Sequence, residues 1–308
     1  MDNTFYLLLK TARPRQWVKN LAVFAALVFS GLLFLDFPDY ILRVTIAFFL
    51  FCITASSVYI FNDIIDLESD KKHPFKKKRP LASGKLSPVL AGGIGIAGLL
   101  VVLIASFFFS TYFLLLLLAY VLLQASYSFV LKHHAILDVM AIAGGFVLRV
   151  YAGAVVVNLH MNVWFLLTVI SASLFLAVGK RQSERTLLEG KLGTRRTLEH
   201  YSQRLLDIYT GMFANTTWLM YALYTFQRSE FIPEGRLLEL FTILPKTFIT
   251  QKWLMITVPL VIYGVMRYLQ LVYEQNRGES PDRVLLEDKP LLLTVVAWGV
   301  AVLLILYL

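Results

Sequence analysis

The chain has 308 residues, of which 58% are hydrophobic and only 16% are charged, and its mean hydropathy is +0.68. Soluble globular proteins carry about 25% charged residues, so the composition excludes a soluble fold and a disordered chain, and the single cysteine, Cys52, excludes a disulfide framework. The net charge of +9 lies in a few segments between apolar runs, which is typical of membrane proteins and of sites for anionic substrates rather than of nucleic-acid binding. The sequence predicts an all-α integral membrane protein.

Nine apolar stretches are long enough to cross a bilayer as helices, since a hydrocarbon core of about 30 Å requires roughly 20 residues. The stretches are continuous rather than alternating, which disfavours a β-barrel. A short amphipathic segment over residues 2–12 precedes them and is expected at the membrane interface. The predicted spans are 18–35, 41–61, 88–109, 111–131, 135–157, 162–179, 208–226, 253–273 and 290–308.

The lysines and arginines beside these spans predict the orientation. Of the 29 basic residues, 22 lie on the side that carries the N terminus, five lie on the other side and two lie inside spans. The positive-inside rule then predicts a cytoplasmic N terminus and an external C terminus. Two long cytoplasmic loops, 62–87 and 180–207, mix acidic and basic residues. We therefore expect one transmembrane domain, 1–308, in the inner (cytoplasmic) cell membrane, with any active site on the cytoplasmic side.

An aspartate-rich motif follows the second predicted span. Asp63, Asp66 and Asp70 are spaced i, i+3, i+7, which predicts three carboxylates on one face of a helix. Such a group requires a cation, and Mg²⁺ is the natural one because it takes oxygen ligands and bridges carboxylates to substrate phosphates. Asn62 offers a further amide oxygen. The alternative, a solvated loop that only fixes topology, does not account for carboxylates at the end of an apolar helix, where they are costly.

Two charged residues lie inside the fifth predicted span. Asp138 and Arg149 each require a partner or a polar cavity. They are three helical turns apart, about 16 Å by helical rise, and cannot pair directly. Arg149 is interpreted either as a structural residue or as a contact for a lipid phosphate. Gly144, Gly145 and Gly153 on the same span are predicted to allow close helix packing.

The segment after the sixth predicted span reads Gly-Lys-Arg-Gln-Ser-Glu-Arg from position 179 and holds no aspartate before Asp207. A second full metal cluster is therefore not expected there. Lys180, Arg181 and Glu184 instead place two cations around one carboxylate, which suits a phosphate-bearing sugar. The alternative is a positive-inside cap on the span, and for the arginines further along the segment that is the simpler interpretation.

The first motif carries a family resemblance. Asn62-Asp63-x-x-Asp66-x-x-x-Asp70, followed by Arg79-Pro-Leu-Ala-x-Gly84, resembles the first aspartate-rich motif of the UbiA-type membrane prenyltransferases. Nine helices with long cytoplasmic loops after the second and sixth are similar to that fold as well. In the family this motif holds Mg²⁺ against a diphosphate leaving group. The resemblance implies that the three aspartates are catalytic metal ligands and that the chain is a UbiA-like bundle.

The resemblance extends to phosphate contacts. The basic run after the aspartates, which includes Lys76 and Arg79, would place positive charge where a diphosphate requires it. The family usually has a tyrosine and a lysine at the end of the fourth span, where this chain has Tyr127 and Lys132. The alternative for these two is an interfacial aromatic residue and a lysine that extends to the headgroups.

One branch of the superfamily matches further. The stretch Arg13-Pro-Arg-Gln-Trp-Val-Lys19-Asn20, the Gly-Lys-Arg-x-x-Glu segment and His73-Pro74 resemble the decaprenyl-phosphate phosphoribosyltransferases. Members of that branch transfer 5-phosphoribosyl from phosphoribosyl diphosphate to a polyprenyl phosphate, which gives a precursor of arabinose donor lipids. The resemblance implies substrate contacts from Lys19 and Asn20. Taken alone, the stretch is interpreted as an interfacial anchor.

Two other functions stay open from the sequence. A prenyltransferase that uses a prenyl diphosphate donor and an aromatic or other acceptor would share the first motif, but it should also have the second aspartate pair. A transporter for a phosphorylated solute should have inverted repeats and helices interrupted at mid-membrane, and no clear internal repeat is present in the sequence. Neither alternative involves nucleic acid, and association into a homo-oligomer also stays open.

Overall fold

The structure is a computed structural model that describes residues 4–33, 38–72, 76–188, 201–228, 252–274 and 281–307. All regular elements in these ranges are helices. Seven of the described helices are long and apolar enough to cross a membrane: Asp39–Ile65, Pro88–Phe109, Thr111–Phe129, Leu137–Val156, Val163–Arg185, Trp253–Tyr273 and Lys289–Tyr307. The chain divides into two compact units, residues 1–161 with 188–203 and residues 162–187 with 204–308. Each unit is described by itself.

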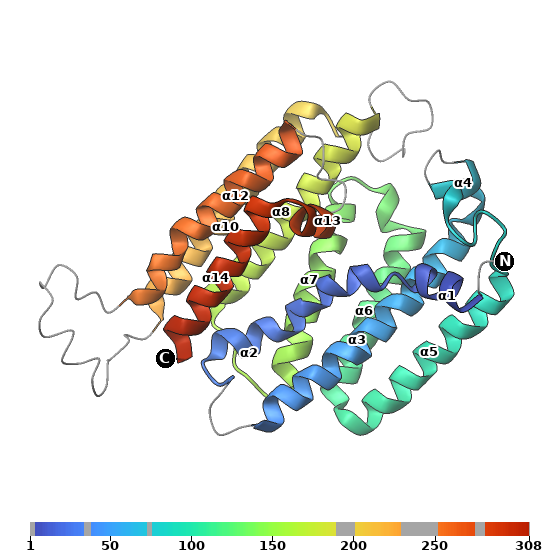
Figure 1. Cartoon of the computed structure of the whole chain (residues 1–308), viewed down its shortest axis with the longest axis horizontal. Helices are drawn as coiled ribbons and strands as arrows, with labels where there is room; N and C mark the ends of the chain where they lie inside the picture. The colour runs from blue at the N-terminus through green and yellow to red at the C-terminus, as the bar shows by residue number, and fades with distance from the viewer. Residues whose placement is uncertain are drawn as a thin grey trace, which may run out of the picture. The chain divides into compact units, whose positions relative to one another are not determined.

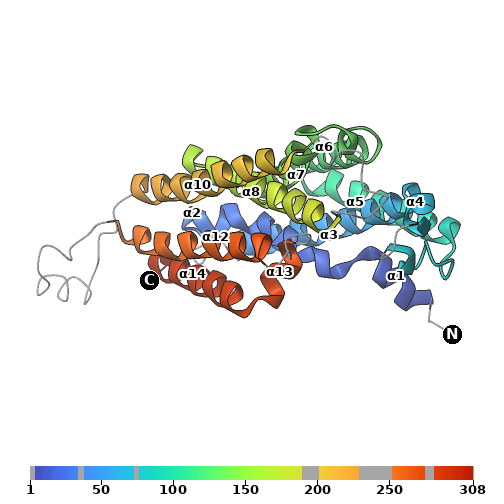
Figure 2. The ribbon, with the colours of Figure 1, turned by 90° about the horizontal axis from the view of Figure 1, so that it is seen from above.

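Helix α3 (Pro38–Ile65) is the centre of the first unit (Figure 1). It packs against α5 (Pro88–Phe109), α6 (Thr111–Phe129), α7 (Leu137–Val156) and the short N-terminal α1 (Thr4–Ala12). Helices α6 and α7 lie side by side (Figure 2). One side of α3 is buried against its neighbours and forms a core with α5, α6 and α7, whereas Leu42, Ile46 and Phe49 remain exposed on another side. This core includes Val44, Phe51, Val102, Phe113 and Ala152.

The predicted first span, 18–35, is not one α-helix. The structure has an 11-residue 3₁₀ helix, η1 (Pro14–Phe24), followed by α2 (Ala25–Ser30), which ends at Gly31 with φ 86°. Runs of 3₁₀ helix longer than three or four residues are uncommon, so tertiary contacts must hold this one. Segment η1 packs on both α3 and α7. Its Val23 carbonyl lies directly against Gly153, where an added Cβ would be 1.7 Å from the oxygen, which confirms the close packing predicted for that glycine.

The segment after α3 folds back onto the same unit. Helix α4 (Leu67–Lys72) and the 3₁₀ turn η2 (Lys76–Lys78) precede a turn with Gly84 at φ 72°. Leu81 and Leu86 are buried in an apolar cluster with Leu7 of α1, Ile60 of α3 and Ala91 of α5. These contacts anchor the 79–86 stretch beside the end of α3.

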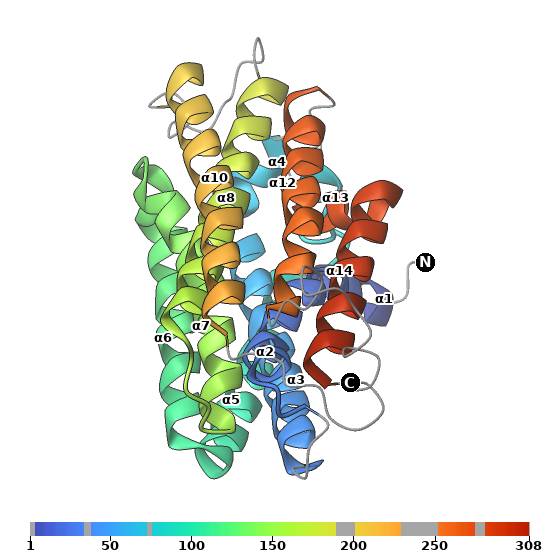
Figure 3. The same ribbon diagram turned by 90° about the vertical axis from the view of Figure 1, so that its left-hand side faces the viewer.

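The second unit consists of α8 (Val163–Leu188), α10 (Gln203–Gln227), η5 (Trp253–Thr257), α12 (Val258–Tyr273), α13 (Pro281–Glu287) and α14 (Lys289–Tyr307). Helices α12 and α14 lie side by side (Figures 1 and 3). Helices α8 and α10 are in contact, with the Phe165 and Tyr224 rings 5.6 Å apart. The core of this unit includes Phe175, Ala214, Tyr268, Leu271 and Leu291.

Two boundaries in this unit differ from those predicted. Helix α8 continues nine residues past the predicted end of the sixth span, to Leu188, because Lys, Arg, Gln and Glu are good helix formers. The predicted loop 180–207 therefore begins as helix. The predicted span 208–226 lies in α10, which is helical throughout but is not among the seven candidate membrane spans. The nine-span count is thus not confirmed in the described part of the chain.

Candidate active site

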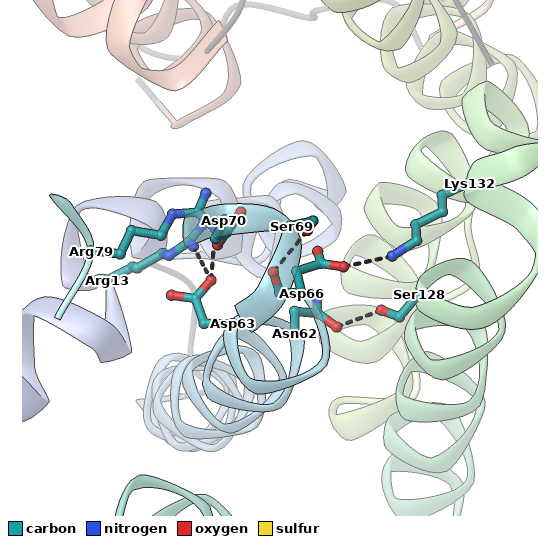
Figure 4. Close-up of polar contacts among 9 residues, drawn as sticks. All are labelled: Arg13, Asn62, Asp63, Asp66, Ser69, Asp70, Arg79, Ser128 and Lys132. Carbon is teal, nitrogen blue, oxygen red and sulfur yellow. Dashed lines mark hydrogen bonds and ion pairs between the residues drawn. The ribbon is translucent and has the colours of Figure 1, made fainter. Parts of the chain in front are cut away.

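Two carboxylates and two guanidinium groups form a compact cluster where α3 ends (Figure 4). Arg79 Nη1 donates to Asp63 Oδ1 at 3.0 Å and to Asp70 Oδ2 at 2.5 Å. Arg13 Nη2 donates to the same Asp63 Oδ1 at 2.5 Å. The side chains of Asp63 and Asp70 are only 4% and 3% exposed. Burial of two carboxylates at this depth requires paired cations, and the two arginines supply them.

Three separate segments bring these groups together. Asp63 lies in the last turn of α3, and the backbone remains helical across the junction with α4, since Asp66 N donates to Asn62 O and Asp70 N to Asp66 O at 2.9 and 2.8 Å. Asp63 and Asp70 are therefore two turns apart on nearly the same face. Arg79 is fixed by the stretch anchored at Leu81. Arg13 precedes η1 and has a left-handed backbone, φ 54° and ψ 58°.

Asp66 lies on a different side from the other two aspartates (Figure 4). At 3.6 residues per turn, Asp70 is rotated about 20° from Asp63 around the helix axis, whereas Asp66 is rotated about 60° in the same direction. Asp66 accepts from Lys132 Nζ at 2.8 Å. Among the described residues, no group of three or more His, Cys, Asp or Glu side chains is placed to hold one metal ion. The predicted three-carboxylate face is thus realised for one pair, and Asp66 pairs with a lysine.

The Asp66 side of the cluster is built by α3 and the end of α6. The Ser128 hydroxyl of α6 donates to the Asn62 side-chain oxygen. Lys132 lies in the 3₁₀ turn η3 (Leu131–His133) directly after α6. Tyr127, next to Ser128, is half-buried. The structure therefore brings Asn62, Asp66 and Lys132 together beside the end of α3.

Lys76, a predicted phosphate contact, lies close to Arg79 in the chain. Lys76 begins η2 and is half-buried, and its carbonyl accepts from Arg79 N at 2.9 Å. His73 and Pro74, which contributed to the family resemblance, lie outside the described residues. Glu68 of α4 is on the surface, where the ammonium group of Lys71 donates to it at 2.6 Å and lowers its pKa.

Asn20 and Arg149 are brought together inside the first unit, but in a second cluster. Arg149 is buried, and its Nε donates to Asn20 Oδ1 at 2.7 Å. Its Nη1 and Nη2 donate to the Gly145 carbonyl at 2.6 Å and to the Tyr120 hydroxyl at 2.9 Å. The guanidinium also lies over the Phe51 ring at 5.4 Å. Arg149 is thus enclosed by neutral groups of α3, α6, α7 and η1.

This second cluster is separated from the carboxylates. Asn20 Nδ2 donates to Cys52 Sγ at 3.2 Å. Cys52 precedes Asp63 on α3 by three helical turns, about 16 Å along the axis. The ammonium group of Lys19 donates to the side chain of Gln16 within η1. Asn20 therefore fixes η1 to α3 and α7, whereas the contact of Lys19 lies within η1.

The predicted 180–184 group lies within α8 of the second unit. Arg181 is 1% exposed and forms an ion pair with Glu184, and Lys180 Nζ is 3.9 Å from Glu184 Oε1. The three residues therefore lie together, two cations around one carboxylate, as predicted. The neighbouring Gln182 connects this part of α8 to other helices. Asp207 of α10 accepts from Gln182 Nε2 and from the Tyr273 hydroxyl of α12, both at 3.0 Å.

Two contact partners, Arg13 for Asp63 and Tyr201 for Asp138, were not predicted from the sequence. Arg13 is 50 residues from Asp63, and no local pattern connects them. Asp138 was expected to require a partner, and the structure provides the buried hydroxyl of Tyr201, which donates to Asp138 Oδ1 at 2.7 Å. The requirement for a partner was visible in the sequence, but its identity was not.

Known proteins match this chain along most of its length. The sequence model described as the UbiA prenyltransferase family matches residues 20–286. The chain is similar to the decaprenyl-phosphate phosphoribosyltransferase of Mycolicibacterium smegmatis, at 35% identity over 94% of this chain and 89% of the relative. It is also similar to the decaprenyl-phosphate phosphoribosyltransferase of Corynebacterium glutamicum, at 33% identity over 97% and 86%. Its fold is similar to that of a UbiA homolog from Archaeoglobus fulgidus bound to GPP and Mg²⁺, with a TM-score of 0.67 at 16% identity over 97% and 99% of the two chains.

Proposed function

Because this chain belongs to the UbiA prenyltransferase family, we propose that it transfers 5-phosphoribosyl from phosphoribosyl diphosphate to a polyprenyl phosphate of the decaprenyl type. The products are diphosphate and polyprenyl-phosphoryl-5-phosphoribose, a precursor of arabinose donor lipids. The observation that carries this proposal is the similarity, along nearly the whole chain, to relatives named for that activity. The charge cluster at the end of α3 supports it, since its groups suit a diphosphate and a metal.

The proposed reaction breaks the bond between C1 of the ribose and the diphosphate oxygen. An oxygen of the lipid phosphate forms the new bond to C1, with inversion if attack is in line. The acceptor is already an anion, so no strong general base is required. The demand on the protein is to neutralise the negative charge that grows on the leaving diphosphate. We assign this to Arg79 and Arg13, whose guanidinium groups suit phosphate oxygens.

The two buried carboxylates of Asp63 and Asp70 suit a divalent metal, and Asp66 would have to leave Lys132 to join them. Asp63 and Asp70 share one arginine, which places two carboxylate groups within reach of a single cation position, and Asp66 and Asn62 lie on the next face of the same helical stretch. These are the hard oxygen donors that Mg²⁺ takes. We propose Asp63, Asp66 and Asp70 as its ligands. When bound, Mg²⁺ would supply positive charge against the diphosphate.

The other predicted residues are assigned proposed roles from their positions and charges. Lys132, Tyr127 and Lys76 are proposed phosphate contacts beside the carboxylates. Lys180, Arg181 and Glu184 are proposed to recognise the 5-phosphate of the donor. The enclosed Arg149 and Asn20 are proposed to hold η1 in place, together with Lys19 inside that segment.

We also propose how many segments lie in the membrane and which side the N terminus faces. The seven candidate spans, together with the 14–30 segment and α10, would make nine membrane-associated segments in one domain, 1–308. The excess of basic residues on one side supports a cytoplasmic N terminus in the inner cell membrane. In this arrangement the segments 62–87 and 180–207 lie on the cytoplasmic side and form the active-site regions.

A donor comparison with purified protein tests the proposal. Labelled phosphoribosyl diphosphate with decaprenyl phosphate should give a labelled lipid, and the Asp63→Asn variant should give none. A labelled prenyl diphosphate with common aromatic acceptors should give no product. If only the second pair reacts, the chain is a prenyltransferase of the ordinary kind. If neither donor is consumed but phosphorylated solutes cross vesicles, the transporter alternative holds instead.

A further inference from the structure

Two guanidinium groups converge on one carboxylate oxygen in the candidate active site. Arg13 Nη2 lies 2.5 Å and Arg79 Nη1 lies 3.0 Å from the same Asp63 Oδ1. Like charges this close repel each other, so the pair is stable only while the anions lie between them. Arg79 also reaches Asp70, so the cluster consists of two cations and two anions in balance.

The backbone at Arg13 is held in a costly conformation that serves this contact. Its φ of 54° and ψ of 58° are in the left-handed region, which a non-glycine residue seldom occupies. The side chain makes no capping hydrogen bond to η1, although Arg13 is the residue at its N-terminal end. Instead the guanidinium crosses the Tyr59 ring, 5.1 Å from its centroid, and reaches Asp63. Strained residues of this kind cluster at functional sites, and this geometry directs one charge onto one carboxylate.

We propose that Arg13 and Arg79 stand in for the metal on Asp63 and Asp70 until metal and diphosphate arrive together, and that they then pass to the diphosphate. This inference rests on the proposed function, which it deepens by giving Arg13 and Arg79 a second role, on the carboxylates of the site before metal and diphosphate bind. Metal alone would displace the arginines and leave two neighbouring cations without an anion. Diphosphate alone would draw the arginines away and leave two buried carboxylates without a cation, which is strongly unfavourable.

Joint binding avoids both penalties. The carboxylates exchange arginine for metal, the arginines exchange carboxylate for phosphate, and every charge keeps a partner. Metal and diphosphate therefore bind cooperatively, and thermodynamic linkage requires that each tightens the other by the same factor. Such couplings are commonly about 5- to 150-fold. The arrangement also keeps the donor site neutral when it is empty.

Equilibrium binding of Mn²⁺ to the full chain in detergent tests this proposal without any turnover. Protein-bound Mn²⁺ is measured by dialysis at matched free Mn²⁺, with and without inorganic pyrophosphate. In the wild type, pyrophosphate should tighten Mn²⁺ binding by about tenfold or more. The Arg13→Gln variant should bind Mn²⁺ alone several-fold more tightly, because one competing cation is gone, and should lose most of the coupling. Arg13→Lys keeps the charge and should keep part of it.

Arg15→Gln is the matched control, since it removes the same charge from an exposed position two residues away. It should leave the coupling unchanged. Unaltered coupling in a folded Arg13→Gln protein would overturn the stand-in role while leaving the metal site intact. If that variant does not fold, the wild-type measurement still tests the inference. Mn²⁺ binding to the wild type that pyrophosphate does not tighten would also overturn it. No Mn²⁺ binding under any condition would overturn the metal site of the proposed function as well.

Discussion

Replacing Gly153 with alanine tests how η1 is held against the first unit. Gly153 of α7 faces the backbone of η1, and an added Cβ would lie 1.7 Å from the Val23 carbonyl oxygen and 2.7 Å from its carbon. Val23 is fully buried, so the clash is with backbone that cannot rotate aside. The 3₁₀ segment must move by more than 1 Å or α7 must shift, because non-bonded carbon and oxygen atoms require about 3 Å or more.

The expected cost follows from two opposing effects. Overpacking a close contact costs about 1–3 kcal/mol, occasionally more, and the rigid backbone places this site at the upper end. Alanine is a better helix former than glycine by about 1 kcal/mol, which offsets part of that cost. The net loss is about 2 kcal/mol, or a decrease in melting temperature of about 3 °C for a chain of this size. Activity should fall too, because η1 carries Asn20 and is preceded by Arg13.

Thermal unfolding of the purified proteins in detergent, followed by size-exclusion chromatography, measures the effect. Gly93→Ala on α5 is the matched control, since its Cβ would meet no atom within 4 Å. The control should melt at or slightly above the wild-type temperature. If Gly153→Ala melts as high as Gly93→Ala and retains full activity, the close approach of η1 to α7 is wrong.

Three further predictions concern the charged groups. Asp63→Asn should abolish turnover in a folded protein, as should excess chelator, whereas the exposed Glu68→Gln should stay active; full turnover in chelator would remove the metal from the account. Lys180→Ala should raise KM for phosphoribosyl diphosphate about ten- to a hundredfold and leave KM for the lipid nearly unchanged, since one charge-assisted phosphate contact is worth about 1.5–3 kcal/mol; equal kinetics would return this lysine to a topological role. Lys132→Met should lower kcat/KM by about tenfold or more, with partial recovery in Lys132→Arg, and indifference to both changes would separate Lys132 from the site.

The membrane helices could be predicted because each is one long apolar run. Residues 41–61 and 88–109, for example, correspond to α3 and α5 within a few residues. The 18–35 segment could not be predicted in this way. Its apolar residues suggest a span, but the contact between Val23 and Gly153, more than a hundred residues away, determines its path. The sixth span was predicted to end at residue 179, because the charged residues that follow were interpreted as a loop. Helix α8 continues through them to Leu188.

The candidate site was only partly visible in the sequence. Helical spacing placed Asp63 and Asp70 on nearly one face, and the structure agrees. The same spacing placed Asp66 with them, but Lys132, directly after α6, donates to the Asp66 carboxylate from the other side. The stretch that begins at Arg13 contributed to the family resemblance, but no local pattern pairs Arg13 with Asp63, since the contact depends on a strained backbone and a partner 50 residues away. Patterns within one helix are thus predictable, whereas partners across segments require the fold.

Mass spectrometry of the lipid product directly tests whether the protein transfers phosphoribosyl to polyprenyl phosphate. Purified protein is incubated with phosphoribosyl diphosphate, decaprenyl phosphate and Mg²⁺. The molecular mass of the extracted lipid is then compared with that of the starting acceptor. We expect a lipid heavier by one phosphoribosyl group that keeps both the lipid phosphate and the 5-phosphate, with one diphosphate released per product. An unchanged lipid, with prenyl diphosphate consumed instead in a parallel reaction, would contradict it.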